Sequence, residues 1–139
     1  MSNSQEMLEA LDQQDLTRAD HYFQKALVED PDDLLLELAY YLEGIGFYPQ
    51  ARQIYEKLAP IFSEVNLNLA SIASEDGQIE EAFAYLEEIQ PNSDSYVSAL
   101  VLKADFYQME GLTDVAREKL LEALNYSDDP LLIFGLAEL

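Results

Sequence analysis

Few side chains in this sequence of 139 residues are of types that could carry out chemistry. His21 is the only histidine, and there is no cysteine to complete a nucleophilic or zinc site with it. The densest carboxylate run is Glu-Asp-Pro-Asp-Asp at 29–33, but a calcium loop needs alternating acids followed by a glycine and a later glutamate. No glycine-rich phosphate loop is present. We therefore expect an exposed histidine, a solvated acidic turn, and a protein that is not an enzyme and has no cofactor or metal.

The net charge and composition indicate which classes of partner the protein can bind. The chain has 28 Asp and Glu against seven Lys and Arg, a formal net charge of −21, which repels nucleic acid and anionic lipid. Such a charge favours a basic partner, or serves solubility alone. The first residues lack the pattern of a signal peptide, and no apolar run reaches the length of about 18 residues that spans a membrane. We expect a cytoplasmic protein that binds neither nucleic acid nor membrane.

Four stretches of the chain repeat one pattern, in which a turn residue precedes an alanine and a bulky apolar residue follows four positions later. The alanines are Ala19, Ala51, Ala82 and Ala116, spaced by 32, 31 and 34 residues. The turn residues are Gly46, Gly77 and Gly111, with Gln14 in the first stretch. A period of this size indicates a stacked array of similar units. It moves the question of function from catalytic residues to an extended binding surface.

Apolar residues between these turns recur with helical spacing, and no stretch alternates as a strand would. Ser2 with Gln5 predicts a capping box before the first helix, and Thr17 with Asp20 predicts another before the second. Later helices are expected at about 34–45, 65–74, 80–89, 96–109, 114–126 and 131–139. The fourth helix is expected to have Pro49 in its first turn and to carry Ala51, Tyr55 and Leu58, with Pro60 late in it and distorting its last turn. The sequence predicts an all-α fold of about nine helices.

This arrangement resembles the tetratricopeptide repeat family, whose unit of about 34 residues is a pair of antiparallel helices, A and B. The small residue that the family places in helix A matches Ala39, Ala70, Ala104 and Ala137. The closing proline matches at Pro31, whereas Pro60 and Pro91 come early. The resemblance implies a right-handed α-solenoid, one domain over 1–139. Its repeats would lie at approximately 2–31, 32–62, 63–93 and 97–129, with a partial repeat at 130–139.

Helix A lines the concave groove in this family, so the resemblance also implies which side chains would meet a ligand. They are Leu36, Glu37, Tyr40, Glu43, Leu67, Asn68, Ser71, Val101, Asp105 and Gln108, with Phe134 and Glu138 continuing the row. Tyr40 is the expected main contact. The row has no Lys or Arg, and Lys103 occupies a position that normally packs. Family members that hold a peptide's C-terminal carboxylate use basic groove residues, so we expect this chain not to bind acidic C-terminal tails.

The segment at 131–139 is nearly all apolar and matches the start of another helix A. Arrays of repeats normally end in a unit with a polar outer face. We therefore expect either that this chain is the N-terminal part of a longer array, or that two copies self-associate through this segment.

Three functions remain open. The first is a non-enzymatic scaffold or adaptor that binds an apolar or basic peptide segment of a partner protein in the groove. The second is a structural spacer or oligomerisation element with no peptide ligand. The third is an acidic inhibitor of a basic, nucleic-acid-binding partner, for which affinity would fall steeply with salt.

Overall fold

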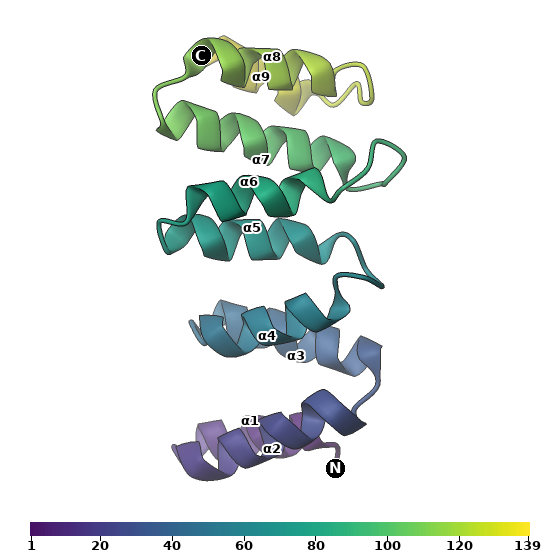
Figure 1. The fold of residues 1–139 in the computed structure, drawn as a ribbon, viewed down its shortest axis with the longest axis vertical. Coiled ribbons are helices and arrows are strands. Elements are labelled where there is room, and N and C mark those ends of the chain that lie inside the picture. The colour runs from purple at the N-terminus through teal and green to yellow at the C-terminus, as the bar shows by residue number, and fades with distance from the viewer. The chain divides into compact units, whose positions relative to one another are not determined.

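The computed structural model describes residues 1–139 and is all-helical, with nine α-helices and no strand (Figure 1). Successive helices pair into hairpins joined by short turns, which is the α-solenoid architecture that the repeats predict. The chain divides into two compact units, Met1–Pro60 (unit 1) and Ile61–Leu139 (unit 2). Unit 1 contains the first four helices and unit 2 the other five.

Unit 1 consists of α1 (Asn3–Asp12), α2 (Leu16–Glu29), α3 (Asp32–Gly44) and α4 (Tyr48–Leu58). The capping box at the start of α1 is confirmed, since Ser2 and Gln5 each accept a hydrogen bond from the other's backbone N–H. The cap predicted at Thr17 is wrong. The carboxylate of Asp15 accepts the Arg18 backbone N–H at 3.1 Å and caps α2, which begins at Leu16.

The acidic run at 29–33 was predicted to be a solvated turn, but one of its residues, Asp30, also joins two helices. Asp30 Oδ2 accepts hydrogen bonds from the Ser4 backbone N–H at 2.9 Å and from the Ser4 hydroxyl at 2.6 Å. The Asn3 side-chain amide donates to Asp30 and to Glu29. The first N–H groups of a helix have no partner within the helix itself. Asp30 therefore satisfies one of them and holds the end of α2 against the start of α1.

Tyr55 on α4 is the largest fully buried side chain, and its hydroxyl needs an acceptor inside unit 1. It is 0% exposed and donates a hydrogen bond to Glu43 Oε1 on α3 at 2.6 Å. Its ring lies 6.1 Å from that of Tyr40. Burial, and then the bond to Glu43, raise the pKa of Tyr55. The core position predicted for Tyr55 is confirmed, and the bond to Glu43 joins the two helices of this hairpin.

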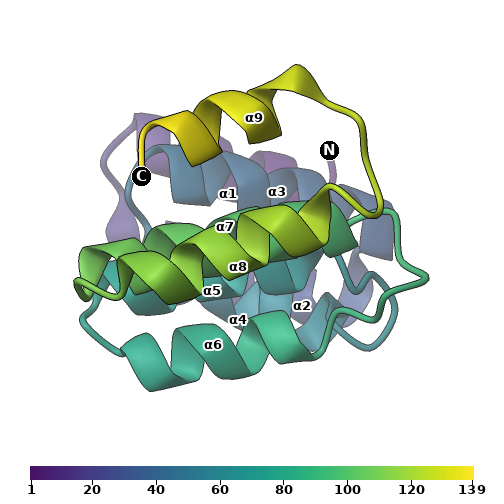
Figure 2. The same cartoon turned by 90° about the horizontal axis from the view of Figure 1, so that it is seen from above.

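Unit 2 consists of α5 (Val65–Glu75), α6 (Ile79–Glu87), α7 (Tyr96–Met109), α8 (Thr113–Ala123) and α9 (Pro130–Ala137). The hairpins α5–α6 and α7–α8 carry most of its packing, and α9 packs on α8. Figure 2 shows α9 and α6 on opposite sides of the α7–α8 hairpin. The side of α7 that faces away from α6 therefore faces α9.

The turns within the hairpins explain the spacing of the glycines. Gly46, Gly77 and Gly111 have φ values of +88°, +77° and +82°. Gln14 is the one non-glycine residue with positive φ, at +59°, and lies in the first turn. A left-handed backbone costs an ordinary residue about 1–2 kcal/mol. Glycine removes this cost at three of the four turns.

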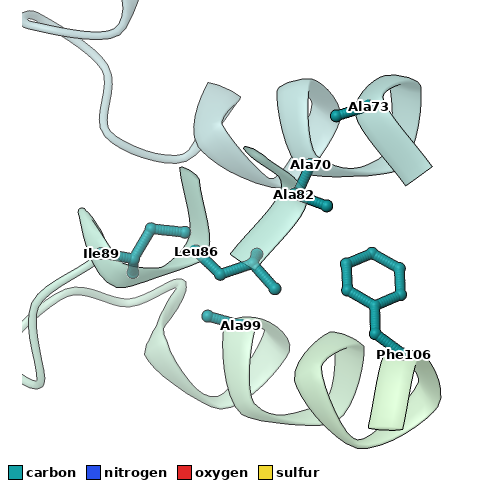
Figure 3. Close-up of a cluster of buried hydrophobic side chains, with 7 residues drawn as sticks. All are labelled: Ala70, Ala73, Ala82, Leu86, Ile89, Ala99 and Phe106. Carbon is teal, nitrogen blue, oxygen red and sulfur yellow. The ribbon is translucent and has the colours of Figure 1, made fainter. Parts of the chain in front are cut away.

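The core of unit 2 combines small and large side chains from α5, α6 and α7 (Figure 3). Its buried members are Ala70, Ala73, Ala82, Leu86, Ile89, Ala99 and Phe106, each at most 3% exposed. Phe106 meets Phe83 edge to face, with 5.7 Å between ring centroids. Alanines where helices cross allow close approach, and the larger side chains fill the space between them. The repeated alanines therefore have the packing role that the sequence predicts.

Lys103 on α7 is the one buried basic residue. Its side chain is 8% exposed, and its Nζ lies 2.7 Å from Glu87 Oε1. The prediction that Lys103 packs instead of facing a ligand is confirmed. Its ammonium group is neutralised by a carboxylate whose own side chain is 68% exposed.

Several helix ends differ from the predicted ranges. α3 begins at Asp32, two residues before Leu34, because acidic residues are favourable in the first turn of a helix. α6 ends at Glu87 and α8 at Ala123, both short of the predicted ends. Pro60 lies beyond α4, which ends at Leu58, so it does not distort that helix. A proline has no N–H with which to continue the helical pattern.

Candidate functional site

Unit 2 contains a groove of about 460 Å³ between α7 and α9, with one side chain each from α5 and α8. We call it the α7–α9 groove. The residues that line it are Leu67, Val97, Ser98, Val101, Leu102, Ala104, Asp105, Gln108, Leu120, Asp129, Leu131, Leu132, Gly135, Glu138 and Leu139. Its volume is within the range of about 300–1,000 Å³ that is typical of ligand sites.

Four of the ten residues predicted to meet a ligand are brought together here: Leu67, Val101, Asp105 and Gln108. Helical geometry explains the three from α7, because residues three and four positions apart share one face. Asn68 and Ser71, also predicted, are half-buried on α5 and do not line this groove.

The other four predicted residues lie on α3 in unit 1. Tyr40 is 46% exposed, and one side of its ring faces the buried ring of Tyr55. Glu43 is half-buried and accepts the Tyr55 hydrogen bond, so it supports the core in addition to any contact with a ligand. Leu36 is half-buried and Glu37 is exposed.

Sequence reasoning missed most of what α9 contributes to the groove. Glu138 was expected in the row, but Phe134 was expected with it and does not line the groove. Leu131, Leu132 and Gly135 of α9 line it instead. The signal was present in the spacing, because Leu131, Gly135 and Leu139 are separated by four residues each.

The charge of the groove has one sign. Asp105, Asp129 and Glu138 are its ionisable residues, and no Lys, Arg or His lines it. Asp129 accepts the Leu131 backbone N–H at 3.0 Å and caps α9. Asp105 makes no hydrogen bond or ion pair in the structure, and partial burial raises the pKa of its carboxyl. The groove can therefore accept hydrogen bonds and a positive charge, and it offers apolar surface around them.

Three features of the structure bear on catalysis and on membranes. His21 is exposed on α2, with its ring 5.1 Å from that of Tyr22. No three residues among His, Cys, Asp and Glu are arranged to hold a metal ion. None of the helices has the length and apolar character needed to cross a bilayer.

Comparisons with known proteins agree with the repeat architecture. No family model matches the chain. A segment of 83 residues is 37% identical to the "TPR repeat-containing protein YpiA" of Bacillus subtilis (strain 168). This match covers 59% of the present chain and 20% of that protein, so it spans about a fifth of the relative's length.

A solved structure has the same fold. The chain is similar to the crystal structure of MamA, with a TM-score of 0.61 over 84% of this chain and 71% of that one, at 20% sequence identity. The repeated turn and alanine positions, the paired helices and these similarities lead to one conclusion. The chain therefore resembles the tetratricopeptide repeat proteins in its repeated turns, its paired helices and its fold.

Proposed function

We propose that this chain is a non-enzymatic protein-interaction module and that the α7–α9 groove holds an apolar or basic peptide segment of a partner. The observation that carries the proposal is the lining of this groove, in which apolar side chains surround unpartnered polar groups and no basic residue is present. Helical grooves with apolar anchors are a recurrent way to bind peptides. Leu67, Val101, Asp105 and Gln108 would contact the segment, with Leu131 and Glu138 facing them.

The remaining residues of the predicted row stay part of the proposal. Tyr40, with Leu36 and Glu37, would form a second contact surface on α3, where an exposed aromatic ring suits an interaction site. Glu43 would act there by supporting Tyr40 and Tyr55. Asn68 and Ser71 would offer hydrogen bonds from α5.

The experiment measures binding of a fluorescein-labelled peptide of alternating leucine and lysine to the wild-type chain by fluorescence anisotropy. Leu131→Ser removes an apolar side chain that lines the groove and is 71% exposed, so the fold tolerates the change. Loss of part of a leucine contact is worth about 1 kcal/mol, or a fivefold weaker affinity. Leu121→Ser is the matched control, because Leu121 is also exposed (50%) but lies on α8 outside the groove.

Equal effects of the two substitutions would place binding elsewhere and overturn the proposal. The acidic-inhibitor alternative is favoured by the net charge of −21 and makes a different prediction. If charge alone attracts the partner, affinity falls steeply with salt and Leu131→Ser changes nothing. If apolar anchors contribute, the effect of Leu131→Ser persists at high salt.

A further inference from the structure

The two ends of the α7–α9 groove differ chemically. α7 and α9 run in the same direction, because α8 reverses the chain between them (Figure 1). Val97 and Leu131 lie at the amino-terminal ends of these helices, and Val101 lies further along α7. Asp105 and Glu138 lie toward the carboxyl ends. The groove therefore gains the carboxylates of Asp105 and Glu138 toward this end, beside the apolar side chain of Leu139.

The third carboxylate of the groove does not reverse this polarity. Asp129 lies at the apolar end, but its side chain accepts the Leu131 backbone N–H and is used as the cap of α9. At the acidic end Gln108 has no hydrogen-bond partner in the structure, and its amide can accept or donate. Asp105 and Glu138 are the two carboxylates of the groove that make no hydrogen bond in the structure.

The ionised carboxylate of Asp105 is destabilised by its surroundings in the folded chain, and a bound cation would offset this effect. It has no hydrogen-bond donor or basic partner, and burial raises the pKa of its carboxyl. It lies in the second half of α7, and the last turn of α7 has no basic residue that could pair with it. α9 likewise has no basic residue in its last turn, and Glu138 follows it directly. Neither helix end therefore supplies a positive charge to the groove.

The occupant must bring positive charge that this chain does not have. A second copy carries the same net charge of −21 and would be repelled from an acidic groove. A segment of a different protein, with a Lys or Arg close to an apolar residue, matches both ends of the groove. Charge complementarity of this kind steers encounter and fixes the direction of a bound segment.

Building on the proposed function, we propose that the α7–α9 groove selects a basic segment of a partner protein and binds it in one direction. An apolar side chain of the segment occupies the end formed by Val97, Val101 and Leu131. A lysine or arginine follows it and pairs with Asp105 and Glu138.

The test uses two synthetic peptides that share their leucines and differ only in having lysine or glutamine at the charged positions. Asp105→Asn keeps the shape of the side chain and removes its charge. It is expected to weaken the lysine peptide about three- to fivefold, the worth of one solvent-accessible ion pair, and to leave the glutamine peptide unchanged. Asp94→Asn is the matched control, because Asp94 is exposed in the loop before α7 and does not line the groove.

The direction of binding is read separately, from amide signals of the protein in the presence of spin-labelled lysine peptide. A label beside the lysine is expected to broaden Gln108, and a label beside the leucine is expected to broaden Ser98. The opposite pattern would overturn the direction.

The outcomes separate this inference from the proposed function. If both peptides bind with equal affinity and Leu131→Ser weakens both, the groove binds apolar segments and the charge selection is wrong. If neither peptide binds wild-type protein, the proposed function and this inference fail together. Misfolding does not confuse the result, because Asp105 is exposed and Asp105→Asn keeps the shape of its side chain, so thermal melting should show a stability at least equal to wild type.

Discussion

Lys103 and Glu87 form one ion pair, yet replacing each of them is expected to change stability differently. The Lys103 side chain is 8% exposed and the Glu87 side chain is 68% exposed, with 2.7 Å between their charged atoms. Lys103→Met keeps an unbranched side chain in the core and removes the buried charge. Glu87 then returns to water at little cost. Replacing buried charge with apolar groups is often neutral or stabilising, so we expect a change within about 1 kcal/mol.

Glu87→Gln has a larger expected cost, because it leaves the Lys103 ammonium buried without a full counter-charge. Breaking a fully buried pair costs about 3–5 kcal/mol, whereas an exposed pair is worth about 0.2–1 kcal/mol. This pair is buried on one side only, and water can reach the position that the Glu87 carboxylate leaves. We therefore expect a loss of about 1–3 kcal/mol.

Urea unfolding followed by circular dichroism measures both variants and the double variant Lys103→Met/Glu87→Gln. Once the ammonium is absent, Glu87→Gln should cost nothing further, so the double variant should match Lys103→Met. The reasoning is wrong if Lys103→Met costs more than Glu87→Gln, or if the double variant shows the sum of the two losses.

Three further predictions concern a turn, a carboxyl and the apolar helix. Gln14→Gly should stabilise the protein by about 0.5–1 kcal/mol by removing a left-handed non-glycine residue, whereas Gly77→Ala should destabilise it by about 1–2 kcal/mol, both measured by urea unfolding. Because burial raises the pKa of Asp105, its ionisation opposes folding. This cost grows as pH rises from the ordinary value of about 3.9 to the raised value. Asp105→Asn should therefore raise the melting temperature more at pH 7 than below that window, and an equal gain at both would contradict the assignment. Self-association through α9, where Ile133 and Phe134 are exposed, should increase with salt as the net charge is screened. Sedimentation equilibrium should then show that Phe134→Ser reduces it.

The hairpin turns could be predicted because their determinants are local. A left-handed residue must follow each helix A, and Gly46, Gly77 and Gly111 meet that requirement within the turn itself. The start of α2 was less certain for a related reason. Asp15 and Thr17 are both good capping residues, and the choice between them depends on where the backbone leaves the Gln14 turn.

Only the α7 side of the groove could be predicted from the sequence. That side depends on local helical periodicity, whereas the α9 side depends on packing between residues that are distant in sequence. The face of α7 follows from helical periodicity once Ala104 is placed in the core. The rotation of α9 depends on the packing of Leu132 with Leu100 and Leu120, which are distant in sequence. The hydrogen bond from Tyr55 to Glu43 is of the same kind, since it joins side chains of two helices and leaves no local pattern.

The pairing of each helix with its neighbour in the chain also bears on how the protein is made. Helices in substantial contact are adjacent or next but one in order, so no long loop must close before contacts form. Synthesis of about 30 residues takes roughly 2–6 seconds, whereas helical proteins fold in microseconds to milliseconds. One hairpin cannot bury its apolar face alone, so neighbouring hairpins must stack to do so. The hairpins of unit 1 can therefore begin to pack while the ribosome is still adding the residues of unit 2, which shortens the time during which their apolar surfaces are open to aggregation.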